Sequence, residues 1–248
     1  MRTYVITGAG SGIGRAITKQ LANEGHRCIL VGRNRHHLKE TVSGLEGDHL
    51  MLTADMRSLT ELKALAAELG DLAVDGIMAN AGTGGENHWG EHDRWQEIVD
   101  TNLTGTYNFV NTLLPHLKRS AEPFKHIIIT SSVLARLGVE NYSAYCASKA
   151  GLLGLMRSWA VQYAPGNILV NAVCPGWVRT EMSVEGMEGI ARGLGITVPQ
   201  FYDMAMQSVP LKKMSEPEEI ARLISFLLKQ QSITGQTIDI NNGAVMNS

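Results

Sequence analysis

Two residues on one predicted helix have the chemistry needed to move a proton. Tyr145 and Lys149 are four residues apart inside a helical pattern near 143–164, so their side chains share one face of that helix. A phenol is a poor acid or base at neutral pH because its pKa is about 10. A neighbouring ammonium favours the phenolate, and lowering the pKa by about three units takes about 4 kcal/mol of electrostatic stabilisation. Since this spacing is common in helices, the surrounding motifs decide whether the pair is functional.

A glycine-rich turn follows the first predicted strand and opens the first predicted helix. It reads Thr7-Gly8-Ala9-Gly10-Ser11-Gly12-Ile13-Gly14. Glycines at such a place permit a tight turn, let backbone approach a pyrophosphate and bring the helix close to the strand. The helix N-terminus adds unpaired N–H groups and the positive end of the helix dipole. The turn therefore predicts a dinucleotide site, with a purely structural glycine turn as the alternative.

The end of the second predicted strand bears on the choice of dinucleotide. An acid is expected there, about 20 residues beyond the glycine turn, to hold the ribose 2′-hydroxyl of NAD. The chain instead reads Val31-Gly32-Arg33-Asn34-Arg35. An arginine can form a charge-assisted, bidentate contact with a 2′-phosphate. Arg33 therefore favours NADP(H), with NAD(H) as the alternative if Arg33 and Arg35 are solvated loop charges.

The elements that must position these residues are short apolar strands alternating with helices. Strands that are apolar on both faces are typical of a buried parallel sheet. Strict alternation predicts a single doubly wound α/β domain of the Rossmann type, with right-handed crossovers and ligands at the carboxyl ends of the strands. The predicted strands cover 4–7, 28–31, 49–53, 76–79, 126–130, 169–173 and 236–240, and the predicted helices lie near 12–24, 34–44, 58–69, 91–118, 143–164 and 216–229.

Composition is that of one ordinary globular domain over residues 1–248. Hydrophobic residues make up 44% and charged residues 19%, and the formal net charge is −2. That balance gives no basic surplus for nucleic acid, and no apolar run approaches the roughly 18 residues of a membrane span. Cys28, Cys146 and Cys174 have no CxxC spacing, which fits a reducing compartment. We therefore predict a cytoplasmic protein without a metal site.

One segment, 182–209, interrupts the alternation. Long irregular segments in compact α/β domains often act as lids. We expect a mobile apolar flap over the substrate, with a packed surface excursion as the alternative. The opposite wall of the pocket is expected from Val133, Leu134 and Leu137. The segment's large apolar residues are Met182, Met187, Met204, Met206, Phe201 and Tyr202.

Taken together, these motifs resemble the classical branch of the short-chain dehydrogenase/reductase family, and in particular its 3-oxoacyl reductases. The resemblance runs from Thr7 to Asn242-Gly243. The glycine spacing is Thr-Gly-x3-Gly-x-Gly, and Asn80-Ala81-Gly82 matches the end of an Asn-Asn-Ala-Gly motif whose first position is Ala79 here. The remaining matches are Asp55 with Met56, Asn102 in Thr-Asn-Leu-Thr-Gly, Ser132, Tyr145 with Lys149, and Pro175-Gly176-Trp177-Val178-Arg179-Thr180.

The resemblance implies a role for each match. Tyr145 is the general acid or base, and Ser132 orients the substrate oxygen. Lys149 lowers the pKa of the tyrosine and binds the ribose, and Asn102 holds a water against the lysine. Asp55 lies on the adenine side and Thr180 faces the carboxamide. The expected cofactor-binding residues are Gly8, Gly10, Ser11, Gly12, Ile13, Gly14, Arg33, Asp55, Met56, Asn80, Ala81, Gly82, Tyr145, Lys149, Pro175, Gly176, Val178 and Thr180.

The implied function is the NADP(H)-dependent interconversion of a ketone and a secondary alcohol on a small to medium apolar substrate, acyl or alicyclic. An NAD-dependent alcohol or hydroxyacyl dehydrogenase and a catalytically silent nucleotide sensor are the alternatives. Lys118, Arg119 and Lys125 could contact an acyl-carrier protein, but the turn 164–167, where a basic patch would continue, is uncharged.

A homotetramer built on the helices near 91–118 and 143–164 is also expected from the resemblance. The second of these helices has more apolar residues than one buried helix face requires. They are Leu152, Leu153, Leu155, Met156 and Trp159.

Overall fold

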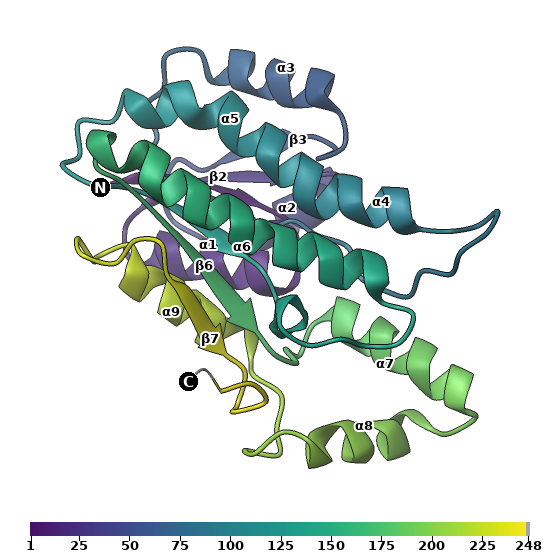
Figure 1. The fold of residues 1–248 in the computed structure, drawn as a ribbon. Coiled ribbons are helices and arrows are strands. Elements are labelled where there is room, and N and C mark those ends of the chain that lie inside the picture. Colours follow the sequence, from purple (N-terminus) through teal and green to yellow (C-terminus); the bar gives the residue numbers. More distant parts are fainter. Residues whose placement is uncertain (247–248) are drawn as a thin grey trace.

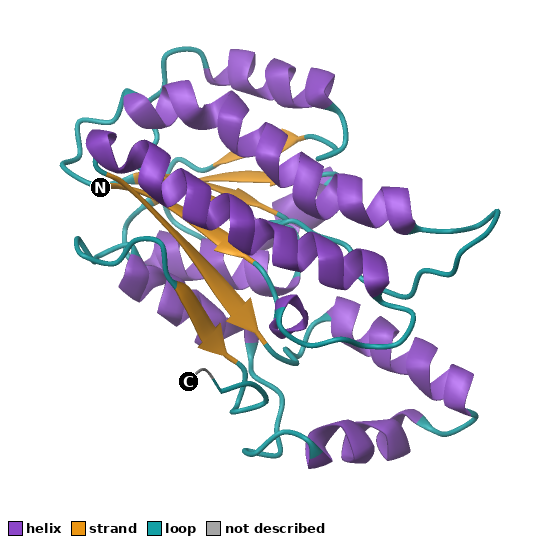
Figure 2. Ribbon diagram, viewed as in Figure 1, coloured by secondary structure: helices purple, strands orange, loops and turns teal. Residues whose placement is uncertain are grey.

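A seven-stranded parallel sheet forms the centre of the computed structural model, which describes residues 1–246 (Figure 1, Figure 2). The strand order is β3-β2-β1-β4-β5-β6-β7. The order changes direction between β1 and β4, and ligands of open α/β sheets bind at such a switch point. The strands are β1 (Thr3–Thr7), β2 (Arg27–Gly32), β3 (Leu50–Thr53), β4 (Gly76–Ala79), β5 (Lys125–Thr130), β6 (Ile168–Pro175) and β7 (Thr237–Ile240).

Helices cover both faces of this sheet, which confirms the predicted doubly wound α/β architecture. On one face, α3 (Leu59–Leu69), α5 (Gly105–Lys118) and α6 (Ser143–Tyr163) pack on the strands. On the other face lie α1 (Gly12–Asn23), α2 (Arg35–Val42) and α9 (Pro217–Leu227). All residues of β4 and β6 are buried as a result, as expected of parallel strands that are covered on both sides.

The predicted helix near 91–118 is wrong in its details. Residues 91–94 precede the helix, which begins as α4 (Trp95–Val99). A π-helical turn, η1 (Asp100–Thr104), then joins α4 to α5. Single π-helical turns inside α-helices are frequent at functional sites, and this one contains Asn102, whose side chain is fully buried. Periodicity did not reveal the turn because one extra residue hardly changes an apolar pattern.

The segment 182–209 is also more regular than we expected. It forms α7 (Glu181–Leu194) and α8 (Val198–Gln207), which pack on each other below the body of the molecule in Figure 1. Met187, Phe201 and Met206 are buried in a small core of their own. The irregular flap is therefore corrected to a helical pair, and three of its large apolar residues are used to hold that pair together.

The apolar residues of α6 give no support to an oligomer. Leu152, Leu153, Met156 and Trp159 are buried in the core of the single chain, and Leu155 packs against it. The surplus noted in the sequence is thus accommodated within one subunit. Within residues 1–246, no helix is both long and apolar enough to cross a membrane.

Candidate active site

Two adjoining cavities run along the carboxyl ends of the strands. They share Gly8, Ser11, Ala81 and Gly82, which follow β1 and β4 at the switch point of the sheet. The first cavity extends from there toward Arg33 and the second toward Lys149. Together they bring 17 of the 18 predicted cofactor residues to one elongated site, the exception being Gly14.

The glycine turn has the backbone that a dinucleotide cradle requires. Gly8 and Gly12 have φ angles of +65° and +46°, a region that side chains disfavour. A Cβ at Gly14 would collide with the carbonyl oxygen of Gly8, so this glycine serves the close packing of α1 on β1 rather than the cavity. A Cβ at Gly82 would lie 3.3 Å from Nζ of Lys149. The turn and the helix N-terminus therefore fit the phosphates of a dinucleotide.

Charged residues gather at the far end of the first cavity. Arg33 is exposed and lines it together with His37 and Asp55. The Arg57 guanidinium lies 2.6 Å from the Asp55 carboxylate and, with a smaller contribution from Arg33, holds the pKa of Asp55 below its usual value. Arg57 and His37 were not predicted as part of this region. Arg57 could have been noticed from its place two residues after Asp55, whereas His37 enters only through the path of α2.

Ser132, Tyr145 and Lys149 line the second cavity together. Ser132 follows β5, and its Oγ accepts the backbone N–H of Leu134 at 3.1 Å. Tyr145 lies in the first turn of α6, and Nζ of Lys149 lies 5.5 Å from the centre of its ring. Lys149 is 4% exposed and donates to the carbonyl oxygen of Thr130 at 3.0 Å. The structure thus brings the predicted trio to one place, at the ends of two elements.

The pKa of Tyr145 differs from the sequence expectation. Burial raises it to about 12, against a hydrogen bond with Ser132 that lowers it. Burial also lowers the pKa of Lys149 to about 8. The i, i+4 spacing predicted that Lys149 lowers the pKa of Tyr145. In the chain alone this does not happen, because the low-dielectric surroundings favour the neutral form of both groups.

Asn102 does not line either cavity. Its Oδ1 accepts the backbone N–H of Thr83 at 2.8 Å. Its Nδ2 donates to the carbonyl oxygen of Thr83 at 3.0 Å and to Oγ of Ser148 at 3.1 Å. The side chain therefore fastens the segment after Gly82 to α6.

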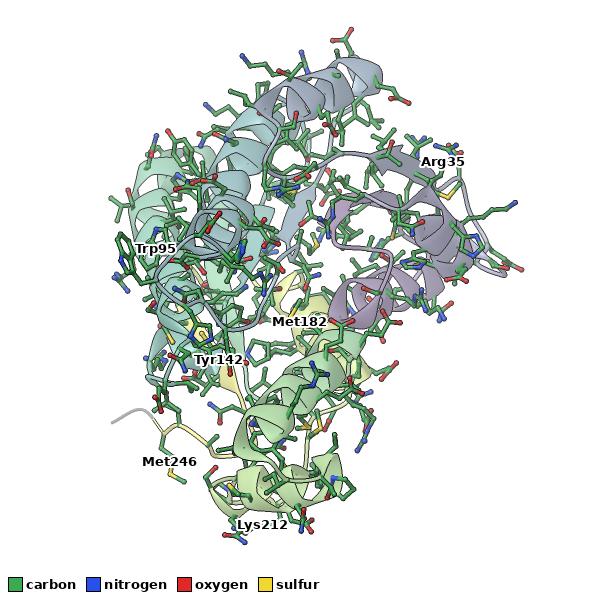
Figure 3. All side chains as sticks on the ribbon, turned by 90° about the vertical axis from the view of Figure 1, so that its right-hand side faces the viewer. Arg35, Trp95, Tyr142, Met182, Lys212 and Met246 are labelled. Atoms are coloured by element: carbon green, nitrogen blue, oxygen red, sulfur yellow. The ribbon has the colours of Figure 1, made fainter. Side chains whose placement is uncertain are left out.

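The floor and mouth of the second cavity come from the segment after β6. Pro175, Gly176, Val178 and Thr180 line it as predicted by the motif. Glu181, Met182 and Ser183, at the start of α7, line it as well, and Figure 3 shows Met182 between Tyr142 and the more distant Arg35. Of these three, Glu181 and Ser183 were missed, since no motif marks them.

The predicted opposite wall does not line this cavity. Val133 is buried, Leu137 is 44% exposed, and neither these two nor Leu134 is among the residues that line the cavity. Gly84 takes a nearby position instead. A Cβ there would lie 3.5 Å from Sδ of Met182 and 3.7 Å from Cε2 of Tyr145.

The fold and this site define a nucleotide-binding oxidoreductase with a Ser–Tyr–Lys centre. A family model described as enoyl-(acyl carrier protein) reductase matches residues 8–245. The chain is 31% identical to the 3-oxoacyl-[acyl-carrier-protein] reductase FabG of Thermotoga maritima, over 99% of this chain and 98% of that protein.

Solved structures agree with that similarity. A variant of the actinorhodin polyketide ketoreductase, crystallised with NADPH, superimposes with a TM-score of 0.91 at 29% identity, covering 98% of this chain and 97% of that one. Levodione reductase gives 0.86 at 28% identity, covering 98% and 96%. The chain belongs to the short-chain dehydrogenase/reductase family, in its 3-oxoacyl reductase-like branch. It is an enzyme that works on CH–OH and carbonyl groups with NADP(H).

Proposed function

We propose that this enzyme reduces the keto group of a small to medium apolar substrate, a 3-oxoacyl compound or an alicyclic ketone, to a secondary alcohol with NADP(H). The observation that carries the proposal is the shared cavity of Ser132, Tyr145 and Lys149, continuous with the glycine turn. The similarity to a 3-oxoacyl reductase and to levodione reductase supports these two substrate classes.

Each residue of the centre has a defined task in this proposal. NADP(H), when bound, supplies or accepts the hydride. Tyr145 gives the proton on its Oη to the substrate oxygen, and in the reverse direction removes it. Ser132 donates a hydrogen bond to the same oxygen and orients it. Lys149 holds the ribose, and its charge stabilises the phenolate that Tyr145 becomes after the transfer.

The same cavities suggest which residues hold the cofactor. The glycine turn from Gly8 to Ile13 would hold the pyrophosphate, Arg33 the 2′-phosphate and Asp55 the adenine. The nicotinamide would lie against Pro175-Gly176 with Thr180 at its carboxamide. We also propose a single domain over the whole chain, acting in the cytoplasm as a homotetramer.

The tyrosine supplies the sharpest test. Tyr145→Phe removes the proton donor but keeps the ring, so kcat should fall by about 10²- to 10⁴-fold while the Kd of NADPH changes little. The assay uses purified protein with NADPH and a panel of 3-oxoacyl thioesters, alicyclic diketones and aldoses. More than about a tenth of the wild-type kcat in the variant would contradict the role of Tyr145.

A second candidate activity is the reduction of an enoyl thioester, which the description of the matching family model favours. Its substrate has a carbon–carbon double bond in place of the ketone. A trans-2-enoyl thioester therefore belongs in the panel. Turnover of it above that of every ketone would replace the proposed function with this one.

A further inference from the structure

The helix that carries Tyr145 has no cap of its own. The N-cap residue of α6 is Tyr142, whose side chain makes no capping hydrogen bond. The first turn, which holds Ser143, Ala144 and Tyr145, therefore presents backbone N–H groups that need partners from elsewhere. Tyr145 is the third residue of this helix, so any fraying of the first turn would displace its hydroxyl.

A residue from a distant loop supplies the missing cap. Oδ1 of Asn87 accepts the backbone N–H of Ala144 at 2.9 Å and the hydroxyl of Ser143 at 3.1 Å. Its own backbone N–H donates to the carbonyl oxygen of Asn141 at 2.7 Å. Asn87 is 8% exposed, and its Nδ2 donates to Oδ1 of Asp93 at 3.2 Å. Both ends of the amide are thus hydrogen-bonded.

The loop that carries Asn87 also borders the catalytic centre. Gly84, three residues earlier, lies beside Tyr145 and Met182. Arg94 donates to the carbonyl oxygen of Gly84 at 3.1 Å, and Asn102 holds Thr83. The loop is therefore fastened near Thr83 and again at Asn87. The second of these two attachments is the set of hydrogen bonds between Asn87 and the first turn of α6.

We propose that Asn87 is a positioning residue for Tyr145: from the loop after β4, its side chain caps α6 and fixes the tyrosine against Ser132. The inference rests on the proposed role of Tyr145 as proton donor. The amide is required for two reasons. Its oxygen accepts from the helix, and its nitrogen donates to Asp93, so neither a carboxylate nor an apolar side chain can do both.

The first test is Asn87→Ala. Loss of the cap should let the first turn fray, and misplacement of a reacting group on this scale lowers kcat by about 10- to 100-fold. The Kd of NADPH, measured by fluorescence titration, should change by less than about twofold, since the glycine turn and Arg33 are untouched. Ser58→Ala is the matched control, because Ser58 caps α3 through the backbone N–H of Glu61 and no residue of α3 lines either cavity. Since Glu61 also accepts the backbone N–H of Asp55, kcat is compared at saturating NADPH. It should lower Tm to a similar degree and leave kcat unchanged.

The second test exchanges the two partners. Asn87→Asp alone places two carboxylates in contact and should lower kcat as alanine does. In Asn87→Asp/Asp93→Asn the carboxylate still accepts from Ala144, and the new amide can donate to it. Because Oδ1 of Asp93 also accepts the backbone N–H of Trp95, Asp93→Asn alone is measured as the control for loss of that contact. This double variant should recover kcat to within about threefold of wild type. A role limited to stability would give rescue of Tm without rescue of kcat.

Three outcomes would overturn the inference: an unchanged kcat in Asn87→Ala, an equal loss of kcat in Ser58→Ala, or a double variant no better than either single one. Failure of the proposed function has a different signature. It appears as full activity of Tyr145→Phe, or as an inactive wild type, before any Asn87 variant is measured.

Discussion

Burial shifts the pKa values of the two titratable groups of the proposed catalytic centre in opposite directions. It raises the pKa of Tyr145 to about 12 and lowers that of Lys149 to about 8. At neutral pH the tyrosine is therefore fully protonated, which is the state needed to give a proton to a ketone oxygen. Removing a proton from an alcohol requires Tyr145 as the phenolate. The phenolate forms at neutral pH only if additional positive charge near the ring lowers the pKa of Tyr145.

Arg33 is the residue that should set cofactor preference. An ionic hydrogen bond contributes about 1.5–3 kcal/mol, so binding of NADPH should exceed that of NADH by about 10- to 100-fold. Arg33→Asp should reverse the preference, because the new carboxylate repels a 2′-phosphate and accepts ribose hydroxyls. Titration of both cofactors against both proteins measures this.

Arg35 provides the control for that experiment. It carries the same charge two residues further on, but it does not line the cavity that holds Arg33. Arg35→Asp should therefore leave the preference nearly unchanged. NADH binding to the wild type as tightly as NADPH would show that Arg33 is a solvated charge and that the NAD-dependent alternative is correct.

Among the elements, the pair α7 and α8 is held by the smallest core. Phe201 is 7% exposed, and its ring meets that of Trp177 edge-on with centres 6.3 Å apart. Phe201→Ala should destabilise the pair by about 3 kcal/mol. Because Met182 and Ser183 line the cavity from the start of α7, KM for the ketone should rise while the Kd of NADPH changes little.

Hydrogen exchange provides the direct measurement of that destabilisation. Amide protection should fall in α7 and α8 and stay unchanged in the central strands, since local opening draws on the least stable contacts. Phe226→Ala is a suitable control, because Phe226 is 52% exposed on α9. A uniform loss of protection in the Phe201 variant would mean that the pair unfolds only with the whole molecule.

The sequence predicted those elements that local pattern determines. The alternation of apolar strands with helices predicted the parallel sheet. All seven predicted strands begin and end within two residues of the observed bounds. The motif residues from Gly8 to Thr180 could be assigned to one site because parallel strands place their carboxyl ends along one edge. The regular helices of 182–209 were missed because glycines at 186, 189 and 193 lower helix propensity, and packing on Trp177 overrides that.

Contacts between distant segments could not be predicted. Asn87 and Ala144 are 57 residues apart, and nothing in either local pattern indicates that they meet. The same is true of Asn102 and Thr83, whose contact depends on the π-helical turn. The pKa of Tyr145 was misjudged for a related reason, since burial depends on the whole fold whereas the i, i+4 spacing describes only one neighbour.

For the molecule as a whole, His126 should set part of the acid limit of stability. It lies on β5, 2% exposed, and burial, with a smaller effect of Arg2, lowers its pKa to about 4. Between this value and the unfolded value of about 6.5 the unfolded chain binds the proton and the folded chain does not. The contribution of His126 to the free energy of unfolding is therefore fully present above about pH 6.5. It is lost as the pH is lowered, and the loss amounts to roughly 3 kcal/mol at pH 4.

Thermal unfolding between pH 4 and pH 7 measures this effect. His126→Leu should flatten the curve of Tm against pH in that window. Glu24 affects stability only at lower pH. Burial would raise its pKa, but hydrogen bonds from Ser225, Gln20 and Lys229 outweigh burial and hold the pKa at about 2. A variant curve parallel to that of wild type would mean that carboxylates alone cause the acid loss.

The exposed apolar residues of the outer helices bear on the predicted oligomeric state. The buried apolar residues of α6 are already used inside the subunit, but Val161 on α6 is 79% exposed and Tyr107 on α5 is 48% exposed. Single exposed apolar residues are common on protein surfaces, so the expectation of an assembly rests on the family resemblance, and these two side chains mark where an interface built on α5 and α6 would lie. We expect a D₂ tetramer in sedimentation velocity, and Val161→Arg should weaken it because the interface would bury an unpaired charge. Leu211→Arg, in a loop and 64% exposed, should leave the assembly intact. A wild-type chain that sediments as a stable monomer at micromolar concentration would contradict the expectation and assign Val161 to an ordinary solvated surface.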